Sequence, residues 1–233
     1  MTGTKKIIKK KLKEPDEFIT ITERVYLFAT QHAKSVAVGA GIVLVLFLFV
    51  FFYQQWKTKN EEDAYQLFNS AVAMYQVASS PYREASPQDY KTVLERFNEV
   101  VAKFPRTSDG KLAVLYEGNI HLRLGEFDEA IKAYESYLGK AGRERLYRAF
   151  AAEGLGYSYE GKREYEKAID AYQKVVALTQ GFQLANAYFG LGRCYEKMGK
   201  VKEALENYKG FAKISQKSQM MNIVLRKIST LEK

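Results

Sequence analysis

The sequence contains one cysteine, Cys194, and only two histidines, His32 and His121, among its 233 residues. A single cysteine cannot form an intramolecular disulfide, so the fold must be stabilised by packing alone. Two distant histidines without cysteine partners give no metal-ligand cluster of the usual spacing. We therefore expect neither a disulfide framework nor a metal site.

Proline is also scarce, with four residues in the chain and none from Arg106 to Lys233. In that long segment the only helix breakers are isolated glycines. Apolar residues recur at helical spacing on both sides of the proline-containing break at residues 77–88. The sequence therefore predicts an all-α fold, with helices at 61–79 and 87–104 followed by short helices joined by tight turns.

Charge is absent from one long stretch, Ser35–Trp56, which is bracketed by Lys34 and Lys57. As a helix this stretch would reach roughly 33 Å, enough to cross a hydrocarbon core of about 30 Å. No other window is as apolar, and 27% of all residues are charged, which excludes several membrane spans. The sequence predicts one transmembrane anchor at residues 35–56.

Residues 1–34 carry eight basic residues against four acidic ones, and six of the basic residues lie between Lys5 and Lys13. Because basic residues in short loops stay cytoplasmic, we expect a cytoplasmic amino terminus and an extracytoplasmic domain at residues 57–233. The lysine arm is expected either to bind anionic lipid or to act only as a topology signal. Apolar residues from Phe18 to Ala33 predict a juxtamembrane helix. The long charged segment before the apolar run favours an uncleaved anchor over a signal peptide.

Small residues recur at four-residue spacing at the start of the anchor, at Ala33, Ala37 and Gly41. Such a stripe allows a second helix to approach closely. The pattern is also common on surfaces that face lipid. The sequence therefore leaves open a helix-contact face and a plain lipid-facing surface.

Three segments in the second half of the chain align without gaps from a shared glycine. The aligned positions are Gly118, Gly156 and Gly192, then Ala130, Ala168 and Ala204, then Tyr134, Tyr172 and Tyr208, at offsets of 38 and 36 residues. A small residue suits the close approach of two antiparallel helices, and the aromatic residue fills the space toward the next pair. The pattern resembles the tetratricopeptide repeat, G-x-x-Y followed by G-x-[FY]-x-x-A-[IL]-x-x-[FY].

This resemblance implies an α-solenoid of about four helix pairs over residues 61–215. The chain departs from the pattern at four positions, and its period exceeds the common 34 residues. Glu117 replaces leucine, Arg163 replaces a helix-ending glycine, and His121 and Val201 replace aromatic residues. After the last pair, residues 215–233 are expected to form a capping helix. Its predicted inward-facing residues are Ile223, Leu225, Ile228 and Leu231.

No catalytic constellation is visible in the repeats, since their glutamates occupy helix-start and surface positions. We therefore expect a non-enzymatic protein without a cofactor. Solenoids of this kind bind partners on a concave face lined by the first helix of each pair. That face is predicted to contain Leu115, Asn119, Leu122, Arg123, Glu153, Tyr157, Phe189, Arg193 and Glu196, unless these are ordinary surface residues. Only Asn119 matches the family's clamp for acidic peptide carboxyl ends, so recognition of that kind is not predicted.

A basic tail, one amino-terminal anchor and an extracytoplasmic repeat domain are together similar to the YfgM-like ancillary subunits of the bacterial Sec translocon. That resemblance implies a single-pass protein of the bacterial inner membrane. Its periplasmic domain would contact translocon components, exported chains or periplasmic chaperones. The alternative is a cell-envelope scaffold for outer-membrane, pilus or peptidoglycan assembly. No specific nucleic-acid partner is expected.

Overall fold

The computed structural model describes residues 17–82, 85–140 and 144–233. Within these ranges the chain forms ten α-helices and no β-strand, which confirms the predicted all-α class. The lysine arm, Lys5–Lys13, lies outside the described residues. Contacts divide the chain into two compact units, residues 1–57 and 58–233.

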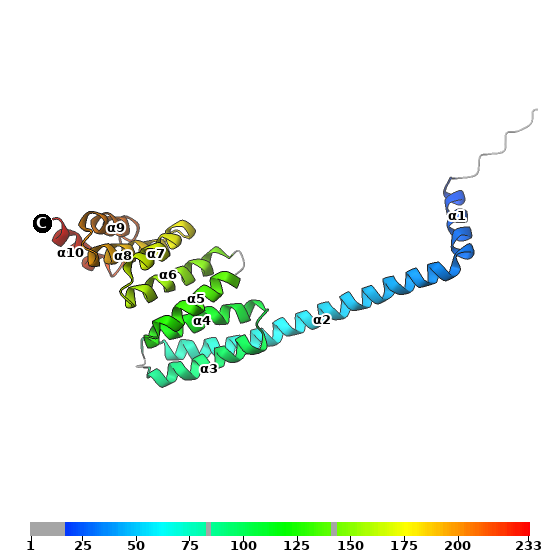
Figure 1. Ribbon diagram of the computed structural model, residues 1–233, viewed down its shortest axis with the longest axis horizontal. Helices are drawn as coiled ribbons and strands as arrows, with labels where there is room; N and C mark the ends of the chain where they lie inside the picture. The colour runs from blue at the N-terminus through cyan, green and yellow to red at the C-terminus, as the bar shows by residue number, and fades with distance from the viewer. Residues whose placement is uncertain (1–16, 83–84, 141–143) are drawn as a thin grey trace, which may run out of the picture. The chain divides into compact units, whose positions relative to one another are not determined.

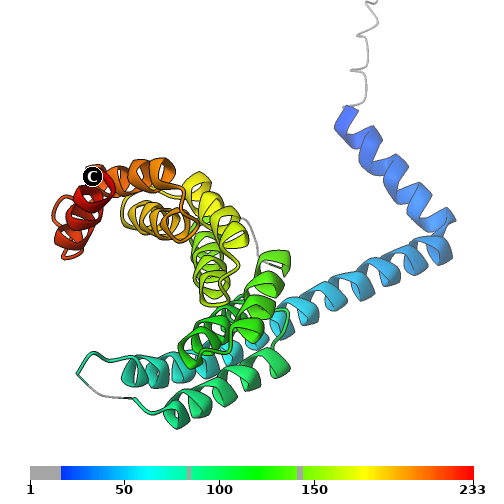
Figure 2. The same ribbon diagram turned by 60° about the vertical axis from the view of Figure 1, so that its left-hand side comes forward.

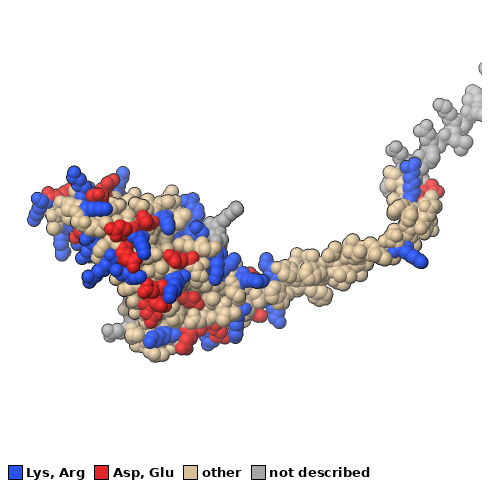
Figure 3. All heavy atoms as spheres, viewed as in Figure 1, with Lys and Arg blue, Asp and Glu red and all other residues tan. Residues whose placement is uncertain are grey.

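The first unit contains helix α1 (Glu17–Gln31) and the beginning of the long helix α2 (Ala33–Ala78). His32 separates the two helices. The predicted anchor, Ser35–Trp56, lies within α2, and none of its side chains is buried in the fold. Figure 3 shows this part of α2 as a stretch without basic or acidic side chains. By length and composition α2 is a candidate membrane span.

The second unit is a stack of antiparallel helix pairs (Figure 1). The end of α2 pairs with α3 (Pro87–Lys103), and the remaining helices are α4 (Ser108–Leu124), α5 (Phe127–Lys140), α6 (Arg145–Gly161), α7 (Tyr165–Leu178), α8 (Phe182–Lys197), α9 (Val201–Ile214) and α10 (Met221–Leu231). First helices of neighbouring pairs contact each other, α4 with α6 and α6 with α8. They therefore lie on the inner side of the arc that the pairs of this unit follow in Figure 2. The predicted four pairs and a cap are confirmed.

Local sequence explains where these helices begin and end. The hydroxyl of Ser86 accepts a hydrogen bond from the Asp89 backbone at 3.2 Å, and Pro87 occupies the favoured first position of α3. Gly125 ends α4 in the left-handed conformation with φ of 76°. Arg163, which replaces the usual glycine, adopts φ of 62° at the equivalent turn. The tight turn is therefore kept after α6 without glycine.

The repeated tyrosines and glycines meet inside the helix pairs. Tyr134, Tyr172 and Tyr208 have no exposed surface. Each ring lies over a glycine of the first helix, and a Cβ added to Gly156 would lie 2.4 Å from Tyr172 Cε1. No side chain larger than hydrogen fits at that position while the ring keeps its place. The spacing seen in the sequence is thus a contact between the two helices of one pair.

The capping helix α10 packs through a different face from the predicted one. Val224 is fully buried against the last pair, while Ile223 is 48% and Leu225 is 51% exposed. Ile228 and Leu231 pack partly against the same cluster. The prediction was wrong for Ile223 and Leu225 because residues 224, 228 and 231 form the helical stripe with the correct four-and-three spacing.

Candidate functional site

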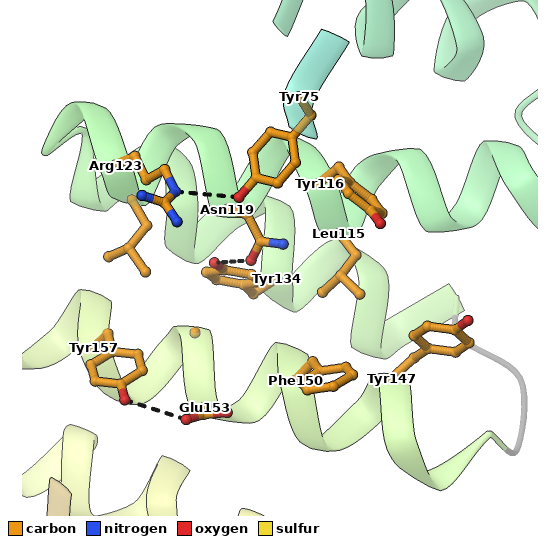
Figure 4. Close-up of a pocket in the computed structure, with 12 residues that line it drawn as sticks. Tyr75, Leu115, Tyr116, Asn119, Arg123, Tyr134, Tyr147, Phe150, Glu153 and Tyr157 are labelled. Atoms are coloured by element: carbon orange, nitrogen blue, oxygen red, sulfur yellow. Dashed lines mark hydrogen bonds between the residues drawn. The ribbon is translucent and has the colours of Figure 1, made fainter. Parts of the chain in front are cut away.

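A groove of about 460 Å³ opens on the inner side of the stack, between α4, α6 and the end of α2 (Figure 4). Its walls are Tyr75, Leu115, Tyr116, Asn119, Leu122, Arg123, Tyr134, Tyr147, Phe150, Glu153, Gly154 and Tyr157. Six of the nine residues predicted for the concave face line this groove, namely Leu115, Asn119, Leu122, Arg123, Glu153 and Tyr157. The structure therefore gathers most of that predicted set into one cavity.

One wall of the groove is an aromatic stripe along α6. Tyr147, Phe150 and Tyr157 recur at three- to seven-residue spacing, and Gly154 leaves room between them. The ring centroids of Tyr147 and Phe150 are 6.4 Å apart. Aromatic side chains offer large contact areas and lose little conformational entropy on binding. This wall suits apolar side chains of a partner.

Several residues that line the groove are not among those predicted for the concave face. They include Tyr75, Tyr116, Tyr147 and Phe150. Tyr147 and Phe150 could have been found from the helical period. Tyr147 lies two turns before Gly154, and Phe150 lies two turns before Tyr157, on the same side of α6. Tyr75 could not have been found, because it lies in the degenerate first pair, where no repeat motif fixes the register.

Hydrogen bonds hold three polar side chains of the groove in place, those of Asn119, Arg123 and Glu153 (Figure 4). The Tyr134 hydroxyl donates to Asn119 Oδ1 at 2.8 Å, and Arg123 Nε donates to the Tyr75 hydroxyl at 3.3 Å. Glu153 Oε1 accepts from the Tyr157 hydroxyl at 3.3 Å and from Asn186 Nδ2 of the next repeat at 3.0 Å. These groups are consequently fixed in place before any partner arrives.

Burial changes the acidity of the groove residues. It raises the pKa of the Glu153 carboxyl, and the hydrogen bonds from Asn186 and Tyr157 lower that pKa in part. Burial also raises the pKa of Tyr157 to about 12. Tyr157 is therefore a neutral hydrogen-bond donor at physiological pH.

The other three predicted residues lie outside the groove. Arg193 donates to both carboxylate oxygens of Glu160, from Nε at 2.8 Å and from Nη2 at 2.6 Å. Its guanidinium carbon lies 4.7 Å from the ring centroid of Phe189 and 5.6 Å from that of Tyr157. Glu196 accepts from Tyr208 at 2.6 Å and from Lys227 at 2.7 Å. These side chains join neighbouring helices to one another.

The contacts of these glutamates recur from one repeat to the next, but they are missing in one repeat. Glu160 and Glu196 occupy equivalent repeat positions, and each binds the buried tyrosine of its own repeat and a cation of the next element. The equivalent residue in the repeat formed by α4 and α5 is Leu122, which cannot make either contact. The groove lies at this gap, because Leu122 leaves the space between α4 and α6 unbridged.

No metal-binding group of three or more His, Cys, Asp or Glu side chains occurs among the residues that the structure describes. Cys194 is fully buried, and burial raises the pKa of its thiol to about 12. A thiol of this kind is a poor nucleophile at physiological pH. His121 is bonded to Glu126 through Nδ1 at 2.7 Å, away from the groove lining.

A family model described as the tetratricopeptide repeat matches residues 147–210, and a second model with the same description matches residues 88–145. Together the two matches cover more than half of the chain. The chain belongs to the tetratricopeptide repeat family. Proteins built on this scaffold are typically non-enzymatic and act through protein partners, and this repeat architecture therefore implies protein-protein interaction. No curated protein sequence matches the chain at a significant level.

Solved structures of other repeat proteins share the fold. A tetratricopeptide repeat protein from Parabacteroides merdae is 16% identical with a TM-score of 0.57, and the match covers 73% of this chain and 60% of that one. BtubC from P. vanneervenii is 16% identical with a TM-score of 0.60, over 75% and 79% of the two chains. A MamA protein is 21% identical with a TM-score of 0.50, over 70% and 86%. At such low identity the similarity shows the fold alone.

The small residues at the start of α2 are exposed. No other part of the fold covers Ala33, Ala37 or Gly41. A Cβ added to Gly41 would meet no atom within 4 Å. This stripe is thus sterically open to a neighbouring helix or to lipid.

Proposed function

We propose that this protein is a single-pass membrane protein whose repeat domain binds other polypeptides through the groove between α4 and α6. In this proposal residues 1–34 are a basic cytoplasmic tail, residues 35–56 are the anchor and residues 57–233 face the periplasm. The membrane is the bacterial inner membrane. The observation that carries the binding proposal is the groove itself, a preformed and largely aromatic cavity on the inner face of a repeat stack.

The proposed partners are exported chains that emerge from the Sec translocon, together with translocon components and periplasmic chaperones. An aromatic wall with a few fixed polar groups binds apolar segments without a strict sequence requirement. Weak and tolerant binding of this kind suits transient contact with incompletely folded chains. The layout of tail, anchor and repeat domain supports the same role through its similarity to YfgM-like subunits.

Photo-crosslinking in living cells tests this function. A crosslinker at Phe150 or Leu122, both in the groove, should give a ladder of newly exported chains and translocon components. The ladder should fade when export is blocked. The matched control is a crosslinker at Gln173, an exposed residue of α7 outside the groove lining, which should give few adducts. A single stable adduct that persists without export would instead identify a dedicated envelope scaffold.

A further inference from the structure

Glu153 is a charged side chain at a position that is apolar in the other repeats. The equivalent residues are Leu115 on α4 and Phe189 on α8. Glu153 is only 8% exposed, and both of its hydrogen bonds come from neutral donors, Asn186 and Tyr157. Burying a carboxylate without a cation is costly. A role in binding a ligand would explain why this repeat keeps a buried carboxylate that lowers its stability.

Two other partly buried carboxylates, Glu160 and Glu196, differ from Glu153 in this respect. Glu160 is paired with Arg193, and Glu196 is paired with Lys227 at 2.7 Å. Among the described residues Glu153 has no such partner. The cation in its own groove, Arg123, donates to Tyr75 and lies 5.9 Å from the ring centroid of Tyr90. The nearby basic side chains are thus engaged elsewhere.

One oxygen of Glu153 remains available to a ligand. Both hydrogen bonds of the carboxylate end on Oε1, and Oε2 accepts none. In the described part of the chain, every fully buried side-chain nitrogen or oxygen has a hydrogen-bond partner. Oε2 therefore keeps some exposed surface, and Glu153 is one of the residues that line the groove.

Aromatic residues lie on both sides of Glu153 along α6. Phe150 lies three residues before Glu153 and Tyr157 lies four residues after it, so both rings share its helical face (Figure 4). The faces of aromatic rings attract cations, and the attraction strengthens where water is excluded. A carboxylate between two rings is the chemistry that receives a lysine or arginine side chain.

We propose that the groove selects polypeptide segments that contain a basic residue, and that Glu153 binds its side chain. Apolar neighbours of that residue would contact the aromatic wall of α6, while Arg123 at the other wall would disfavour a second cation. This inference rests on the proposed function, that the groove binds polypeptide. It adds a charge requirement that an aromatic groove alone would not impose.

Binding of two matched peptides to the full chain in lipid nanodiscs tests the inference. Both are short labelled peptides of leucine, phenylalanine and serine, one with a central lysine and one with norleucine in its place. Wild type should bind the lysine peptide about tenfold more tightly in fluorescence anisotropy, since a hydrogen bond to a charged group contributes at least that factor. Glu153→Gln should bind the two peptides equally. Glu206→Gln, at an exposed site on α9, should keep the preference.

The outcomes separate this inference from the proposed function. Equal binding of both peptides to wild type, with both lost in Phe150→Ala, would overturn the role of Glu153 and leave the groove as a binding site. Binding of neither peptide to wild type would overturn both proposals. The comparison of peptides on wild type alone decides the charge requirement even if Glu153→Gln does not fold.

Discussion

Glu117 shows how one residue that departs from the repeat pattern changes stability. It stands on α4 where leucine is usual, and burial raises the pKa of its carboxyl to about 7, against smaller opposing effects of His121 and Lys140. The folded protein therefore holds a proton on Glu117 that the unfolded chain releases above about pH 4.5. Because the folded state binds more protons in this window, the stability contributed by the protonated carboxyl is lost as pH rises from about 4.5 to about 7.

Glu117→Gln should remove this dependence. The variant should be more stable than wild type by on the order of 1–2 kcal/mol at pH 8, and the difference should shrink as pH falls toward 4.5. Urea unfolding of the full chain at several pH values measures it. A difference that stays constant over this range would show that Glu117 is solvated in the folded protein.

The helix pairs illustrate what sequence spacing can and cannot predict at the scale of elements. The glycine and tyrosine positions predicted the pairs because each Tyr ring contacts a glycine of the same pair, as Tyr172 does at Gly156. The cap has no repeated copy, so its register depended on a choice between neighbouring apolar residues, and Val224 rather than Ile223 or Leu225 is buried.

The groove was predictable only in part for a related reason. Leu115, Asn119 and Glu153 could be placed from the repeat register, which fixes the inner face of α4 and α6. The position of Tyr75 depends on how the degenerate first pair packs against α4, and its sequence has no motif that sets that packing. The engagement of Arg193 with Glu160 depends on contacts between repeats, which the pattern within one repeat does not specify.

Gly156→Ala tests the close packing of a helix pair. The added methyl group would overlap the Tyr172 ring, so the free energy of unfolding should fall by about 2 kcal/mol despite the better helix propensity of alanine. The matched control is Gly139→Ala on α5, where a Cβ meets nothing within 4 Å. That variant should be neutral or gain up to about 1 kcal/mol. Equal effects of the two substitutions in urea unfolding would refute the steric explanation.

For the whole molecule, the decisive property is the side of the membrane on which each part of the chain lies. The apolar stretch of α2 is exposed along its full length, which in water would be a large unfavourable surface. A bilayer removes that cost, and the basic tail before the stretch favours a cytoplasmic amino terminus. In the proposed topology the repeat domain is therefore periplasmic, and the predicted crosslinks to exported chains depend on that location.

The single cysteine makes this topology measurable. Cys194 is fully buried and its raised thiol pKa keeps it unreactive, so a membrane-impermeant maleimide should label wild type only weakly. Gln173→Cys places a thiol on the exposed surface of α7 and should be labelled in intact spheroplasts. Lys9→Cys, in the basic tail, should be labelled only after the membrane is permeabilised. The reverse pattern would place the repeat domain in the cytoplasm, where its groove could not meet exported chains after translocation.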